Sequence, residues 1–78
     1  MNENISTVAK VINKIPTKNK NIFLEIGDST KKSLVFILNT NTRLLKKAKR
    51  VLVDDVIRVI GKAGRLDMIF AKDIEFEI

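Results

Sequence analysis

Residues 22–30 read IFLEIGDST, and this stretch decides the fold. Successive side chains of a β-strand point to opposite faces, so Ile22, Leu24 and Ile26 share one face while Phe23 and Glu25 share the other. The residues that follow, Gly-Asp-Ser-Thr, have the composition of a turn. We predict that Asp28 serves this turn. The pattern predicts a half-buried strand over residues 22–27 with a turn directly after it.

Four further strands are predicted around this one. Residues 34–38 (LVFIL) are apolar on both faces, as in a strand that is covered on both sides. The apolar spacing within residues 5–15 also fits a helix, but the Val and Ile content and the following Pro16 favour a first strand. Residues 56–63 and 68–78 are predicted as the fourth and fifth strands.

One helix is predicted between the third and fourth strands. Residues 39–42 (NTNT) supply N-cap candidates. Apolar residues then follow at helical spacing, namely Leu44, Leu45, Ala48, Val51 and Leu52. The basic run from Arg43 to Arg50 covers the rest of the helix surface. We interpret this run as a solvated face, and a second surface for nucleic acid or an acidic protein remains the alternative.

The order of three strands, one helix and two strands predicts an all-β fold, a small five-stranded barrel with the helix plugging one end. We expect residues 1–78 to form a single domain. A ferredoxin-like fold would need a helix between the first two strands, and residues 16–21 are too few for one. An SH3-like barrel normally has no three-turn helix at this position.

Two motifs resemble those of oligonucleotide/oligosaccharide-binding (OB) folds of the replication protein A and anticodon-binding types. The pattern hydrophobic-x-hydrophobic-x-Asp-x-Thr-Gly is matched by Leu24, Ile26, Asp28 and Thr30. Lys31 stands where the Gly of that turn is usual. The pattern Asp-hydrophobic-hydrophobic-Arg-hydrophobic-x-Gly is matched by Asp55, Ile57, Arg58, Val59 and Gly61. The resemblance implies a binding module whose groove lies on the second and third strands.

The amino-acid composition excludes several kinds of catalytic and structural chemistry. The chain has neither Cys nor His, so disulfides, thiol nucleophiles and imidazole bases are excluded. The sequence has no P-loop, nucleophile elbow or pair of catalytic carboxylates, and we expect no enzyme activity, cofactor, metal or small-molecule substrate. No apolar run is long enough for a membrane helix and the polar start is unlike a signal peptide. We therefore expect a cytoplasmic protein. Association with a nucleoid would be compatible with this location.

The net charge of +6 favours a polyanionic partner. Phe23 is predicted to face outward, where it would stack on bases; packing beneath a loop or against a partner is the alternative. Alternation does not decide the side of Phe36 or Phe70; the core is favoured for Phe36, and ligand contact is the alternative. Phe76 shares a face with Ile74 and is predicted to be core. The candidate nucleic-acid-binding residues are Lys18, Lys20, Phe23, Phe36, Arg58, Lys62 and Arg65.

Two functions follow from these expectations. The first is binding of single-stranded nucleic acid, with DNA favoured over RNA. The alternative is a protein-interaction subunit of a larger DNA- or RNA-processing complex, in which residues 34–38 and the last strand would dock a partner. The few aromatic residues also favour a homo-oligomer or a larger assembly. Glu25 counts against the first function, because it shares the face of Phe23 and would repel phosphate.

Overall fold

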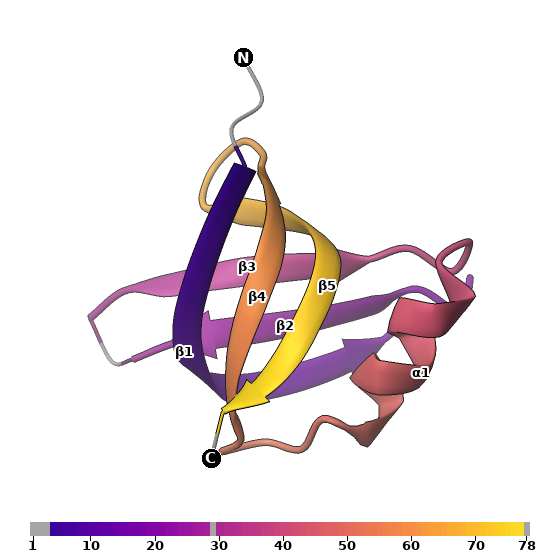
Figure 1. Cartoon of the computed structure of the whole chain (residues 1–78), viewed down its shortest axis with the longest axis horizontal. Helices are drawn as coiled ribbons and strands as arrows, with labels where there is room; N and C mark the ends of the chain where they lie inside the picture. The colour runs from indigo at the N-terminus through magenta and orange to yellow at the C-terminus, as the bar shows by residue number, and fades with distance from the viewer. Residues whose placement is uncertain (1–3, 29, 78) are drawn as a thin grey trace.

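The computed structural model describes residues 4–28 and 30–77. Five strands close into one barrel in the order β1-β2-β3-β5-β4, with a helix between β3 and β4 (Figure 1). The elements are β1 (Asn4–Pro16), β2 (Ile22–Gly27), β3 (Lys32–Ile37), α1 (Thr42–Arg50), β4 (Val56–Ala63) and β5 (Met68–Glu77). This strand order and the position of the helix confirm the predicted OB fold.

Closure of the barrel depends on the length of β1. Residues 4–10 pair with β4 and residues 10–16 pair with β2, and the pairing with β2 contains a register shift between Val11 and Asn13. In Figure 1 the strand bends from the top of the barrel towards α1. A bulge of this kind lets one strand serve two neighbours, because it increases the local twist and bends the strand. β3 and β5 complete the ring through a short parallel pairing.

The barrel interior is filled by aliphatic side chains from every strand. The buried core consists of Val11, Ile22, Leu24, Ile26, Val35, Ile37, Leu44, Ala48, Val51, Ile57, Val59, Ile69 and Ile74. The alternation predicted for β2 is confirmed, because its three isoleucine and leucine side chains all enter this core while Phe23 and Glu25 do not.

The helix closes one end of the barrel and is capped at both termini. At its start, the side-chain oxygen of Asn41 accepts a hydrogen bond from the backbone N–H of Leu44 at 3.1 Å. At its end, Lys14 of β1 donates from Nζ to the carbonyl oxygens of Lys49 and Val51, at 2.7 and 3.0 Å. A cation at this position stabilises the carbonyl groups that have no partner within the helix.

The turn between β2 and β3 forms although Lys31 replaces the usual Gly. Oδ1 of Asp28 accepts hydrogen bonds from the backbone N–H groups of Thr30 and Lys31 at 2.8 and 2.9 Å, and from the Thr30 hydroxyl at 2.7 Å. The Thr30 hydroxyl contributes most to lowering the pKa of Asp28 below its ordinary value. The left-handed conformation falls instead on Gly27, with φ at +133°, where a Cβ would collide with the Lys31 carbonyl oxygen.

The prediction that Phe76 belongs to the core is wrong, because its side chain is 39% exposed. Phe76 does lie two residues beyond the buried Ile74, on the same side of the strand. However, β3 pairs only with residues 68–70 at the start of β5. The far end of β5 pairs with β4 alone, so the barrel wall is incomplete beside Phe76.

In the turn between β4 and β5, the backbone conformation does not suit the residue at position 66. Leu66 and Asp67 both have positive φ, at 54° and 60°, and the N–H of Met68 donates to the carbonyl of Arg65 at 3.0 Å. This is the pattern of a type I′ turn, which favours Asn and Gly. Leu66 is also 97% exposed, so burial does not offset the backbone strain.

Replacing Leu66 by Asn should therefore stabilise the fold. Asn tolerates the left-handed region better than Leu, and we expect a gain of about 1 kcal/mol. For a domain of this size, that gain raises the melting temperature by about 4–8 °C. Leu52→Asn is the matched control, because Leu52 is also an exposed loop leucine (65%) but lacks a positive φ. Thermal unfolding followed by circular dichroism measures both variants, and an unchanged melting temperature for Leu66→Asn would refute the assignment of strain.

Within the described residues, no helix has the length and apolar character needed to cross a membrane.

Candidate nucleic-acid interface

Three phenylalanines form one row across the outside of the barrel. The register pairs Phe23 of β2 with Phe36 of β3, and Phe36 with Phe70 of β5. Ile15 of β1 pairs with Phe23 at one end of the row, and Lys62 of β4 pairs with Phe70 at the other. We call Phe23, Phe36 and Phe70 the aromatic row. It exists because all three strands bring an outward-facing position to the same level of the barrel.

The central ring, Phe36, contacts the rings on both sides of it. The ring centroids of Phe23 and Phe36 are 4.7 Å apart with an angle of 27° between the ring planes, which is a stacked arrangement. Phe36 and Phe70 are 5.8 Å apart at 80°, edge to face. Such pairs stabilise by about 0.5–1.5 kcal/mol beyond their burial and hold the rings in place. The aromatic row is thus a continuous apolar platform.

The platform settles the sides of two residues that alternation left open. Phe36 lies on the outside of β3, between the buried Val35 and Ile37, so the preference for the core was wrong. Phe70 is also on the outside and is 41% exposed. Phe23 faces outward as predicted, although its ring is half-buried against Phe36.

The β1–β2 loop (residues 17–21) stands at one end of the row and carries Lys18 and Lys20, both exposed. Its shape is fixed by hydrogen bonds. The Thr17 hydroxyl accepts from the N–H of Asn21 at 3.1 Å, and the N–H of Lys20 donates to the Thr17 carbonyl at 3.1 Å. Asn39 binds the loop from the side, through Asn19 and Asn21. The two lysines therefore project from a defined turn.

The β4–β5 loop (residues 64–67) stands at the other end and carries the exposed Arg65. Gly64 lies beneath the Phe70 ring, because a Cβ at this position would come within 2.7 Å of the ring atom Cε2. The carbonyl of Asp67 accepts a hydrogen bond from the N–H of Leu34 at 3.0 Å and ties the loop to β3. Lys62, half-buried on β4, completes the cationic side of this end.

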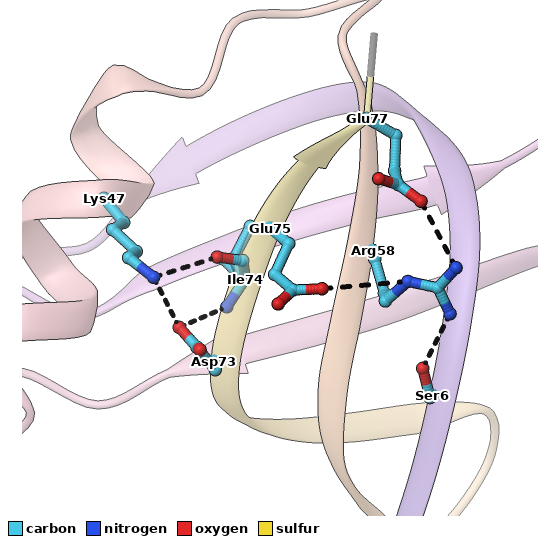
Figure 2. A network of polar contacts seen from close by, with 7 residues as sticks. All are labelled: Ser6, Lys47, Arg58, Asp73, Ile74, Glu75 and Glu77. Atoms are coloured by element: carbon cyan, nitrogen blue, oxygen red, sulfur yellow. Dashed lines mark hydrogen bonds and ion pairs between the residues drawn. The ribbon is translucent and has the colours of Figure 1, made fainter.

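The structure does not bring Arg58 to the aromatic row. Arg58 points out of the barrel as predicted, but it lies four residues from Lys62, roughly 13 Å along β4. Its guanidinium contacts Glu77 at 3.2 Å, Glu75 at 3.8 Å and the Ser6 hydroxyl at 3.1 Å (Figure 2). Two carboxylates already neutralise this cation, and it would have to leave them to meet a phosphate.

Lys47 is similarly engaged, unlike most of the basic helix. Its ammonium donates to Oδ1 of Asp73 at 2.8 Å and to the Ile74 carbonyl at 3.2 Å (Figure 2). The hydrogen bond from Lys47 is the main cause that lowers the pKa of Asp73 below its ordinary value. This contact fixes one flank of α1 to β5.

Glu25 is the one acidic side chain that the sequence places beside Phe23. It is half-buried on β2, where it pairs with Asn13 and Leu34. Within residues 4–28 and 30–77 it makes no ion pair. Glu25 thus leaves a negative charge one row away from the rings.

Sequence reasoning missed the contribution of Ile15 and did not settle that of Phe70. Ile15 continues the apolar platform on β1. Alternation from the first half of β1 does not place Ile15, because the register shift between Val11 and Asn13 changes which residues face outward. Phe70 lies between the β4–β5 turn and the register shift at Ile60/Gly61, so its spacing from the turn at residues 64–67 was a signal that could have given its level in the barrel.

The fold, and not a sequence family, relates this chain to known proteins. No protein-family model matches the chain, and no curated protein matches it significantly. A chain in the crystal structure of the Stn1–Ten1 complex of S. pombe is similar in structure, with a TM-score of 0.83 and 19% sequence identity. The match covers 95% of this chain and 57% of that chain, so this chain spans little more than half the length of its neighbour. The likeness shows that the two share the OB fold.

Proposed function

We propose that this chain binds single-stranded nucleic acid, DNA in preference to RNA, across the aromatic row. The observation that carries the proposal is the row itself. Three phenylalanine rings lie in contact on the outside of the barrel, between two loops that carry cationic side chains. Bases can stack on phenyl rings whatever their sequence, and Lys or Arg at the edges of such a surface can meet the phosphates.

The contacts between the rings limit the strength of binding. Phe23 and Phe36 cover part of each other, so the platform suits about two bases, which contribute on the order of 2–6 kcal/mol in total. A micromolar dissociation constant corresponds to about −8.2 kcal/mol. Phosphate contacts have to supply the remainder. The candidates at the ends of the row are Lys18, Lys20, Lys62 and Arg65.

A second function is favoured by a different observation. Ile15, which pairs with Phe23, and Leu38, which directly follows β3, are further exposed apolar side chains on these strands. An apolar face of this kind also suits a protein partner, and the structural neighbour was crystallised as a complex. The alternative is therefore an interaction subunit of a larger assembly that handles nucleic acid.

Fluorescence anisotropy with labelled poly-dT, poly-U and duplex DNA tests the proposal. We expect saturable binding of poly-dT with a dissociation constant on the order of micromolar at 50 mM salt, weaker binding of poly-U, and weakest binding of the duplex, because paired bases cannot reach the rings. Light scattering on the same samples reports the oligomeric state. A stable dimer that binds none of the three nucleic acids would refute the proposal and select the interaction subunit.

A further inference from the structure

A cleft of about 350 Å³ opens between the β1–β2 loop and α1, at the lysine end of the aromatic row. Its apolar lining comes from Pro16, Ile22 and Leu45, and its cationic lining from Lys20 of the loop and Lys49 of the helix. Lys20 connects the two surfaces, because it lines the cleft and belongs to the loop at the end of the aromatic row. Ile22 is next to Phe23 in sequence, but its side chain lies on the opposite, inner face of β2. Figure 1 shows α1 beside the ends of β1 and β2, where this loop lies.

The charge of its lining residues distinguishes this cleft from a larger cleft on the molecule. A cleft of about 530 Å³ is lined by Lys10 and Lys32 but also by Asp28 and Asp54, and Lys10 is ion-paired to Asp54 at 3.4 Å. Its formal charges cancel. The cleft beside α1 has two ammonium groups and no carboxylate among its lining residues. Of the two, only the latter attracts an anion.

The two flanks of α1 differ in the same way. On the β5 flank, Lys47 is paired with Asp73, and Arg43 borders a small hollow that also contains Asp73. On the loop flank, Lys49 and Leu45 face the cleft, and the described residues place no acidic group in its lining. One flank of the basic helix thus has a carboxylate partner, whereas the cleft on the other flank has none among the described residues.

We propose that the loop flank of α1 continues the binding path, and that a single strand leaving the aromatic row enters the cleft and places a phosphate between Lys20 and Lys49. This inference rests on the proposed function and extends its site from the sheet to the helix. The apolar lining accepts the sugar or base of the same nucleotide, while the ammonium groups bind its phosphate. A short strand that fills only the row does not reach Lys49, and a longer one does.

The test compares Lys49→Gln with Arg43→Gln, using oligo-dT of about 6 and about 12 nucleotides, lengths within the range that OB folds bind. Both substitutions remove one exposed helix cation and keep a good helix former, but they lie on opposite flanks of α1. For the longer strand, we expect Lys49→Gln to lower the logarithmic salt slope by about 0.7, the share of one phosphate contact. Between 50 and 200 mM salt, this variant then loses about 2.6-fold less affinity than the unmodified chain. Arg43→Gln and the shorter strand show no such change.

Each outcome decides a separate point. Equal effects of the two substitutions would show that only the overall charge matters, and would overturn the path over the helix while leaving the aromatic row in place. An equal effect on both strand lengths would overturn it as well, because Lys49 would then belong to the first contacts. If the unmodified chain binds neither strand, the proposed function itself fails, and this inference fails with it. Melting curves of both variants confirm that the helix remains folded.

Discussion

Phe36→Ala is expected to weaken the binding of single-stranded DNA by about 5- to 150-fold, the equivalent of one lost base stack of 1–3 kcal/mol. Phe36 is the central ring and contacts both Phe23 and Phe70. Its loss removes one stacking surface and also frees the two remaining rings to move. The effect should therefore exceed that of replacing either outer ring, and titration by fluorescence anisotropy at 50 mM salt measures it.

Two further variants distinguish the loss of base stacking from other causes of weakened binding. Phe76→Ala is the matched control, because Phe76 is about as exposed as Phe70 but lies away from the aromatic row, at the far end of β5. It should leave the affinity unchanged. Phe36→Leu keeps an apolar side chain without a ring and should bind almost as weakly as Phe36→Ala. Full affinity in Phe36→Leu would show that the platform works by apolar burial, as in protein docking, and would refute stacking.

The elements that sequence reasoning placed well are those with strict local patterns. The bounds of β2 and β4 follow from alternation and from the residues at their ends, and Asn41 lies among the N-cap candidates. The first strand was harder to recognise because β1 carries a bulge near Ile12 and exposes Val8. Together these features produce a spacing of apolar residues that resembles the spacing in an amphipathic helix. A strand that pairs with two neighbours in turn cannot keep a single alternation.

The site was less predictable because it depends on pairing between distant strands. The outward direction of Arg58 follows from its neighbours on β4, but its partners Glu75 and Glu77 lie on β5. Likewise, Phe36 is surrounded by apolar residues in sequence, and only its register with Phe23 and Phe70 shows that it faces outward. Local pattern gives the two possible sides of a strand, whereas the closed barrel decides which side is the interior.

The second large effect expected is a steep dependence of binding on salt. For a short strand that covers the aromatic row, the phosphate contacts are assigned to four cations, namely Lys18, Lys20, Lys62 and Arg65. Each contact with single-stranded nucleic acid contributes about 0.7 to the logarithmic slope, so the slope should be about −2.8. Affinity then falls roughly 50-fold between 50 and 200 mM salt.

Two substitutions on β4 locate the origin of this slope. Lys62 pairs with Phe70 beside the rings, whereas Arg58 is held by Glu75 and Glu77. Lys62→Gln should reduce the slope to about −2.1, and Arg58→Gln should leave it near −2.8. Both remove one positive charge from the same strand, so a general effect of net charge would change the two slopes equally. A flat salt response of the unmodified chain would mean that the cations at the ends of the row do not meet phosphates, because each such contact releases bound counterions and steepens the slope.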